Sequence, residues 1–171
     1  YIIKLDEQED NRGEFARYWC KKEYSSFGLD ANIAQINYSM NKKKGVIRGM
    51  HFQRQPKAET KIVRCINGAI WDVIVDIRES SKTFGKWFGT KLTAENRSMI
   101  YVPKGFAHGF QSLVDNVELL YLHSEFYSKI DEGGLLCNDI SVGIDWPIPI
   151  SEISERDKSH PTINELEPVK L

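Results

Sequence analysis

Residues 45–61 of the chain read GVIRGMHFQRQPKAETK, and this stretch decides the fold. It places His51 on an apolar strand, with Arg48 just before it and Lys61 about one strand further on. Because side chains of a strand alternate between its two faces, Arg48 and His51 can face the same way only across a bulge or bend. A second stretch, VPKGFAHGF at 102–110, also places a histidine, His108, on a predicted apolar strand. Together they predict a β-barrel pocket with a histidine base, a cationic floor and an arginine for an anionic substrate.

The rest of the chain is typical of an all-β protein. Short runs of β-branched and aromatic residues recur at roughly ten-residue spacing, with Gly, Pro, Asn or Asp in nearly every gap. No amphipathic helix of about ten residues separates them, so a sandwich or barrel is predicted. The Asn67-Gly68 pair predicts a tight hairpin, and residues 6–13 predict a polar turn. The expected strands are 1–5, 15–19, 34–40, 61–66, 70–77, 87–92, 98–102, 106–113 and 117–127.

Helical structure is expected only in short pieces. Residues 21–29 are consistent with one helical turn. Ser154 is placed to cap another turn over residues 155–157. The chain of 171 residues suits a single domain, 1–171, with a real core. Residues 165–171 are expected to form a mobile tail.

Composition excludes several classes of protein. Apolar residues make up 41% and charged residues 27%, and the formal net charge is -1, which argues against a broad nucleic-acid-binding surface. No apolar run approaches the roughly 20 residues of a membrane helix, and the opening residues lack a signal-peptide pattern. Cys20, Cys65 and Cys137 are widely spaced, without a C-x-x-C motif. They fit reduced thiols, so a cytoplasmic location is predicted.

The two histidine-bearing stretches resemble the motifs of the cupin superfamily. The first is a glycine, five residues and His51, and the second is P-x-G-x-x-H ending at His108. Metal-binding cupins continue with a second histidine and a glutamate, where this chain has Gln53 and Lys61. Two histidines alone do not make a zinc or iron site, which needs three or four ligands. The sequence therefore predicts no metal.

The exchange of a metal ligand for Lys61 suggests its own chemistry. An ammonium group in a low-dielectric pocket can stabilise an enolate oxyanion, as a metal does. A neutral histidine beside it can remove a proton α to a carbonyl group. A nearby cation also lowers the pKa of that histidine and so favours the neutral base.

Longer runs resemble the dTDP-4-dehydrorhamnose 3,5-epimerase family, from about residue 10 to residue 161. This family inverts the carbons on either side of a 4-keto group in a nucleotide-linked sugar and uses no metal or coenzyme. The resemblance implies a cupin-type double-stranded jelly roll, a homodimer and a nucleoside-diphosphate sugar as substrate. The matching runs are RGMHFQ (48–53), DVIVDIRESSKTFGKW (72–87), GTKLTAEN (89–96), VPKGFAHGFQSL (102–113) and NDISVGIDWP (138–147).

The resemblance implies four catalytic residues. His51 resembles the base that takes the α-proton, and Asp157 resembles the carboxylate that pairs with it. Lys61 resembles the group that stabilises the enolate. Tyr121 resembles the acid that returns a proton from the opposite face of the sugar, which inversion requires.

The resemblance also implies eight substrate-binding residues. Arg12 and Arg48 resemble the clamps on the diphosphate, because a planar guanidinium group pairs with phosphate oxygens. Phe126 is expected to stack on the base. The other expected contacts to nucleotide and sugar are Gln35, Asn37, His108, Glu132 and Arg156.

Two departures leave the substrate open. Gln8 stands where the family has Phe, and Arg17 stands where it has Glu, so the base is not assigned. Three other functions also stay open. They are a single-site 3- or 5-epimerase, a 3,4-ketoisomerase of another sugar nucleotide, and a non-catalytic cupin that binds a sugar nucleotide.

Overall fold

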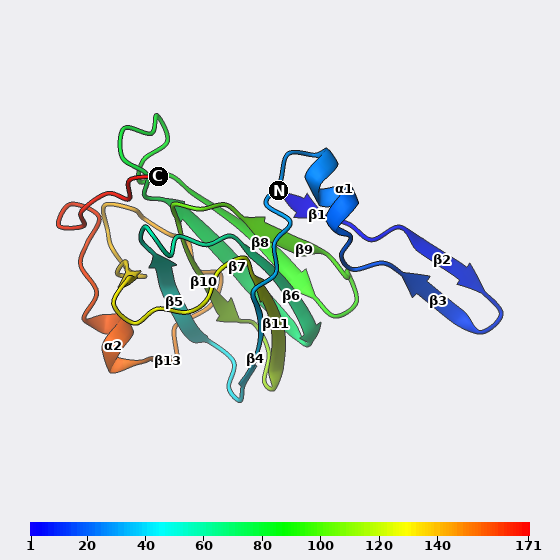
Figure 1. Cartoon of the computed structure of the whole chain (residues 1–171). Coiled ribbons are helices and arrows are strands. Elements are labelled where there is room, and N and C mark those ends of the chain that lie inside the picture. Colours follow the sequence, from blue (N-terminus) through cyan, green and yellow to red (C-terminus); the bar gives the residue numbers. More distant parts are fainter.

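A computed structural model describes the whole chain, residues 1–171, as two facing β-sheets with a separate hairpin reaching away from them (Figure 1). The only helices are short, α1 (Lys21–Ser26) and α2 (Glu155–Lys158). The predicted all-β jelly roll is confirmed. None of the helices has the length and apolar character needed to span a membrane.

The strands divide between the sheets as follows. The five-stranded sheet has the order β1 (Ile2–Ile3), β9 (Met99–Val102), β6 (Lys61–Asn67), β11 (Val117–His123) and β4 (Gln35–Asn41). The six-stranded sheet has the order β12 (Glu132–Gly134), β5 (Val46–Gln53), β10 (Phe106–Ser112), β7 (Ala69–Asp76) and β8 (Trp87–Thr93), with β13 (Glu152–Ile153) beside β5. The separate hairpin pairs β2 (Glu7–Asp10) with β3 (Gly13–Ala16).

Strand β7 shows where the core lies. Its Ile70 and Ile74 belong to the cluster packed between the two sheets. Val73 and Val75 belong to a second cluster on the other face, which the C-terminal segments cover. A strand buried on both faces explains the nearly continuous apolar run of this segment. By the same alternation, Asp72 faces the space between the sheets.

The prediction of a hairpin at Asn67-Gly68 is wrong. Strands β6 and β7, which these residues join, belong to different sheets and do not pair. Gly68 has a φ of 79°, so it makes a tight turn, but the turn carries the chain across the core from one sheet to the other. A local turn signal does not report which strands will pair.

Both ends of the chain also differ from the predictions. Residues 6–13 are more than the predicted polar turn: the turn covers only residues 11–12, and the range also contains β2 and the first residue of β3. The C-terminal segment 165–171 is not free along its length. Val169 is only 1% exposed, donates its N–H to Ile77 and accepts from the N–H of Glu79. An apolar side chain in a short polar segment anchors it to the core.

The expected irregularity of β5 is confirmed. His108 of β10 pairs with His51, whereas Phe110 pairs with Arg48, so β5 has one extra residue between the two pairs. The extra residue brings Arg48 and His51 to the same pocket although they are three positions apart. Gly49 makes this possible with a φ of 129°. A Cβ atom there would lie 2.5 Å from the Cα of Gly109.

This close contact predicts the effect of a single methyl group. Gly49→Ala should lower the free energy of unfolding by about 1–3 kcal/mol more than Gly13→Ala does. Gly13 is a matched control because its φ is 124°, yet nothing lies within 4 Å of the added Cβ. Urea denaturation of the two variants measures the difference. Equal losses would contradict the proposed crowding between β5 and β10.

Candidate active site

A pocket at one end of the space between the sheets collects most of the predicted residues. Three of the four predicted catalytic residues line it, namely His51 from β5, Lys61 from β6 and Tyr121 from β11. Four of the predicted binding residues line it as well: Asn37, Arg48, His108 and Arg156.

His51 and Asp157 form the hydrogen-bonded pair that the resemblance implied. The Nε2 atom of His51 lies 2.8 Å from Oδ1 of Asp157, whose side chain is 4% exposed. Helix α2 positions this carboxylate, and the side chain of Ser154 caps the helix by accepting from the N–H of Asp157 at 3.1 Å. The backbone N–H of Gly49 donates to the other carboxylate oxygen at 3.2 Å. The predicted cap at Ser154 is confirmed.

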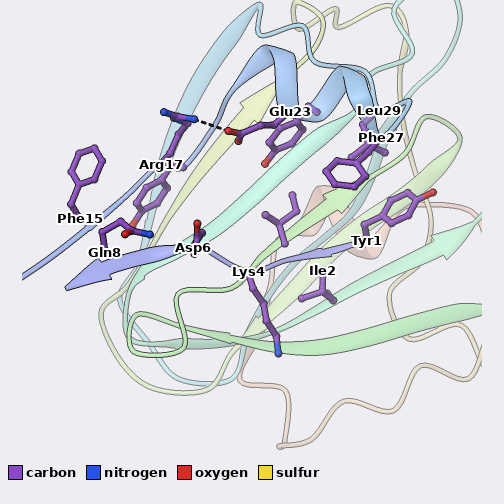
Figure 2. A pocket seen from close by; sticks show the side chains of 13 residues that line it. Tyr1, Ile2, Lys4, Asp6, Gln8, Phe15, Arg17, Glu23, Phe27 and Leu29 are labelled. Atoms are coloured by element: carbon purple, nitrogen blue, oxygen red, sulfur yellow. Dashed lines mark hydrogen bonds and ion pairs between the residues drawn. The ribbon is translucent and has the colours of Figure 1, made fainter.

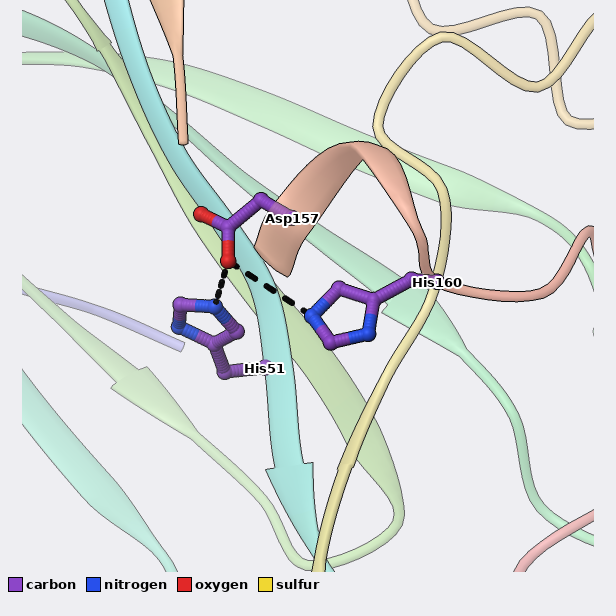
Figure 3. Close-up of side chains that lie close together, drawn as sticks. All are labelled: His51, Asp157 and His160. Atoms are coloured by element: carbon purple, nitrogen blue, oxygen red, sulfur yellow. Dashed lines mark hydrogen bonds and ion pairs between the residues drawn. The ribbon is translucent and has the colours of Figure 1, made fainter. Parts of the chain in front are cut away.

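The contacts of His51 define which ring nitrogen is free. Nε2 also lies 3.0 Å from a guanidinium nitrogen of Arg156, but a single nitrogen cannot donate to Asp157 and accept from Arg156 at once. Because an ionised carboxylate only accepts, Nε2 carries the proton. Nδ1 is then the unprotonated nitrogen, and Figure 3 shows it pointing away from Asp157 and His160.

Burial and neighbouring groups act in opposite directions on the pKa values of His51 and Asp157. Desolvation lowers the pKa of His51, Asp157 raises it, and the cations Lys61 and Arg156 lower it, with a net lowering. Burial works against ionisation of Asp157, but the neighbouring His160 and the hydrogen bond with His51 outweigh it and hold the pKa of Asp157 well below the usual range. At neutral pH the pair is therefore a neutral imidazole beside a carboxylate.

His160 lies on the far side of the same carboxylate. Its Nε2 is 3.5 Å from Oδ1 of Asp157, and its ring meets that of His51 edge to face with centroids 5.7 Å apart. Ligand atoms of the three residues lie within 4.8 Å of one another (Figure 3). The guanidinium of Arg156 stands at the same His51 nitrogen, and its positive charge opposes a metal cation there. This donor set does not fit a resident metal.

Lys61 is held at the pocket floor by two contacts. Its ammonium lies 3.3 Å from Oε1 of Glu59 and donates to the carbonyl oxygen of His51 at 3.3 Å. The residue is 8% exposed, so the charge acts in a largely dry environment where electrostatic interactions are strong. The expected cationic floor is present.

Tyr121 stands on the sheet opposite to His51. Its hydroxyl group lies 3.2 Å from that of Ser39 on the neighbouring strand β4. Desolvation raises the pKa of Tyr121, and the bond with Ser39 only partly offsets this. The phenol is therefore protonated at neutral pH and can donate a proton.

A second carboxylate–histidine pair lies beside Tyr121. Nε2 of His108 is 2.9 Å from Oδ2 of Asp72, and the ring of His108 meets that of Tyr121 edge to face. Both partners are buried, Asp72 at 0% and His108 at 4% exposure. Burial raises the pKa of Asp72, while His108 opposes the shift.

The arginines at the pocket are held by neutral and acidic partners. Nε of Arg48 donates to Oδ1 of Asn41 at 2.6 Å. Arg156 pairs with Glu132 at 2.9 Å, so Glu132 acts on the pocket through Arg156 rather than lining it. The remaining guanidinium N–H groups of both arginines are donors suited to an anionic substrate.

Besides Glu132, three more predicted binding residues do not line the pocket. Arg12 lies at the tip of the β2–β3 hairpin, where its side chain is 90% exposed and pairs with Asp10. Phe126 is 58% exposed beyond β11. Gln35 does not line the pocket itself, but its amide donates to the pocket residue Asn37 at 3.3 Å. The structure does not bring Arg12 to the site of its own chain.

A second hollow lies between β1, the β2–β3 hairpin and α1 (Figure 2). The two departures from the family pattern, Gln8 and Arg17, line it together. Arg17 is paired with Glu23 of α1 at 2.6 Å. This hollow is mainly apolar and contains none of the predicted catalytic residues.

The sequence reasoning missed three residues around the pocket, Glu59, His123 and His160. His123 lies two positions after Tyr121 on one strand, so the period of two could have placed it on the same face. The partners of Glu59 and His160 are distant in sequence, and no local signal indicates them. All four histidines of the chain thus gather here.

Comparisons with known proteins agree with this geometry. The family described as dTDP-4-dehydrorhamnose 3,5-epimerase matches residues 1–165. The dTDP-4-dehydrorhamnose 3,5-epimerase of Shigella flexneri is 44% identical over 149 residues, 86% of this chain and 82% of that protein. The crystal structure of the enzyme of that name from Elizabethkingia anophelis NUHP1 gives a TM-score of 0.92 at 41% identity, covering 96% of this chain and 91% of the other.

A solved structure with a narrower activity is also similar. It is a 3'-monoepimerase from Streptomyces bikiniensis in complex with dTDP-quinovose, with a TM-score of 0.89 at 32% identity. The match covers 96% of this chain and 84% of that one. By the family match and by these relatives, the chain belongs to the dTDP-4-dehydrorhamnose 3,5-epimerase family.

Proposed function

We propose that this protein epimerises a nucleoside-diphosphate 4-keto-6-deoxyhexose through an enolate. The observation that carries the proposal is the placement of His51 and Tyr121 on opposite walls of one pocket that also holds Lys61. Inversion needs a base on one face of the sugar and an acid on the other, and two facing sheets supply these two positions.

His51 is the proposed base and acts through Nδ1. The α-proton moves to this nitrogen, and the electron pair of the broken C–H bond forms the enolate, whose charge rests on the C4 oxygen. The ammonium of Lys61 stabilises that oxygen, and the carboxylate of Asp157 stabilises the imidazolium. This division of roles needs no metal or coenzyme.

Tyr121 is the proposed acid. It gives its phenolic proton to the enolate carbon from the face opposite to His51, and the stereochemistry of that carbon is inverted. His51 then releases its proton to solvent, and the phenolate of Tyr121 takes a proton from solvent, so both groups return to their starting states. For a double epimerisation the same two groups act again at the second carbon next to the ketone, after the ring has shifted in the pocket.

The binding side of the proposal uses the pocket and a second copy of the chain. Arg48 and Arg156 are proposed contacts of the substrate's anionic part, with Asn37 and His108 at the sugar.

We propose a homodimer in which the hairpin carries Arg12 to the partner's site. Its support is that the hairpin leaves the body of its own chain (Figure 1), with Phe15 72% exposed. The nucleotide is proposed to lie near Gln35, Phe126 and Glu132. A cytoplasmic location is also proposed, and the free cysteines support it.

A single-site epimerase is the second candidate. The similarity to a 3'-monoepimerase favours it, because a protein of the same fold is described there as acting at one carbon. The base of the nucleotide is left open by Gln8 and Arg17, which line the second hollow. A 3,4-ketoisomerase, or a non-catalytic cupin that binds a sugar nucleotide, would have the same fold. Either would give a different result in the NMR experiment that follows.

Proton NMR in deuterated water tests the reaction. With dTDP-4-keto-6-deoxy-glucose as trial substrate, we expect enzyme-dependent loss of the hydrogen signals at sugar carbons 3 and 5. His51→Asn should slow this loss at least about 100-fold, because the neutral base is gone. Loss at one carbon only would indicate the single-site epimerase. No loss with this or any other nucleoside diphosphate would overturn the enolate mechanism.

Removing the acid should separate exchange from inversion. In Tyr121→Phe, His51 can still take a proton and return deuterium on the same face, so exchange should continue. Formation of inverted product should fall about 100-fold or more. Tyr101→Phe is the control, because Tyr101 packs on the outer face of the same sheet. Equal loss of exchange and inversion would assign Tyr121 a different role.

The cations around His51 predict a pH effect. Because Arg156 lowers the pKa of His51, Arg156→Gln should raise it, and a higher pH is then needed to keep the base neutral. The acidic limb of the pH profile of kcat/KM should therefore move to higher pH. Arg156→Lys keeps the charge and is the matched control. A limb that stays in place in Arg156→Gln would show that Arg156 does not tune the base.

A further inference from the structure

A continuous line of hydrogen bonds runs along the pocket wall that carries Tyr121. It begins at the backbone N–H of Tyr127, which donates to Oε1 of Gln35 at 3.0 Å. A backbone N–H can only donate, so the amide oxygen of Gln35 must face it. The amide nitrogen of Gln35 therefore faces Asn37 and donates to Oδ1 at 3.3 Å.

The same logic sets the orientation of the next two groups. Since Oδ1 of Asn37 accepts from Gln35, the nitrogen Nδ2 is the atom that lies 3.3 Å from Nε2 of His123. An amide nitrogen only donates, so Nε2 of His123 must accept. The ring proton of His123 is then on Nδ1, which lies 2.8 Å from Oε2 of Glu59.

Glu59 connects this line to the proposed enolate stabiliser. Its Oε2 accepts from His123, and its Oε1 lies 3.3 Å from the ammonium of Lys61. Burial would raise the pKa of Glu59, but His123 and Lys61 outweigh it and lower the pKa, so the carboxylate is ionised. The side chains of Glu59 and Lys61 are 7% and 9% exposed, which leaves their interaction little screened by water.

We propose that His123 is a positioning residue for Lys61, a role that rests on the proposed epimerase function. With its proton on Nδ1, His123 holds one oxygen of Glu59, so only the other oxygen is available to Lys61. The ammonium is therefore held between Glu59 and the carbonyl oxygen of His51 and presents its remaining N–H to the pocket. If His123 did not hold Glu59, the carboxylate would turn fully onto Lys61 and draw the ammonium off the substrate.

Two substitutions at His123 separate its two contacts. The side-chain nitrogen of Asn can occupy the position of Nδ1, so His123→Asn keeps a donor to Glu59 and loses the acceptor for Asn37. The longer amide of Gln reaches the position of Nε2, so His123→Gln keeps a partner for Asn37 and loses the donor to Glu59. We expect His123→Gln to lower kcat about tenfold or more, because Lys61 is misplaced. His123→Asn should lower kcat less than about threefold and act mainly by raising KM.

A pair of glutamate substitutions controls for charge. Glu59→Gln should lower kcat about 10- to 100-fold with a small change in KM, because the new amide can satisfy only one of its two partners. Glu152→Gln is the matched control, since Glu152 also pairs with a lysine, Lys43, at 3.3 Å but at an exposed site. It should leave kcat and KM unchanged. Equal effects on kcat in His123→Asn and His123→Gln, or an unchanged kcat in Glu59→Gln, would overturn the inference.

The ring proton can be observed in the unmodified enzyme, which removes any doubt about folding of the variants. A long-range 1H–15N NMR spectrum of the histidine side chains should show His123 as the Nδ1–H tautomer. A proton on Nε2, or on both nitrogens, would overturn the inference. In the kinetic test, a wild-type enzyme that exchanges no sugar hydrogen would sink the proposed function itself. An active wild type with indistinguishable His123 variants would sink only the positioning role.

Discussion

The contact between Gly49 and Gly109 is the constraint on which the rest of the site depends. Two adjacent strands, β5 and β10, approach so closely there that neither position has room for a Cβ atom. The extra residue in β5 turns Arg48 and His51 toward the same pocket. The N–H of Gly49 also donates to the carboxylate of Asp157, so one backbone irregularity places the base and anchors its partner.

The charges of the pocket are organised in pairs. Asp157 bonds to His51, Asp72 to His108 and Glu59 to His123, at 2.8 to 2.9 Å. Each carboxylate is buried or nearly so, and a buried charge is tolerated only where hydrogen bonds satisfy it. The three pairs differ in their second contact, however. Asp157 receives a backbone N–H and Glu59 receives the ammonium of Lys61, whereas Oδ1 of Asp72 has no partner. Burial therefore raises the pKa of Asp72 while the other two carboxyls titrate lower.

The features that could be predicted from the sequence are those that depend on residues close together in the chain. Strand alternation, the bulge near Gly49 and the cap at Ser154 are set by neighbouring residues, and all three were predictable. The pairing of β6 with β11, rather than with β7, depends on contacts across the whole core. The hairpin predicted from Asn67-Gly68 was therefore wrong.

The site shows the same limit. The family resemblance pointed to His51, Lys61 and Tyr121 together, but Glu59 and His160 act through partners that are distant in sequence. Arg12 resembles a binding residue by motif, yet its hairpin carries it away from the pocket of its own chain. A motif identifies a residue type at a position, whereas only the assembled sheets decide which pocket it reaches.

One physical cause prepares both the proposed base and the proposed acid. Removal from water disfavours the charged form of any group, and for a histidine that form is the acid, whereas for a tyrosine it is the base. The same dry pocket therefore lowers the pKa of His51 and raises that of Tyr121. The two groups move apart on the pH scale, so over a wide range around neutrality one is ready to accept a proton and the other to give one. Only the developing negative charge on the substrate then needs a fixed counter-charge, and Lys61 is the buried cation that this pocket provides.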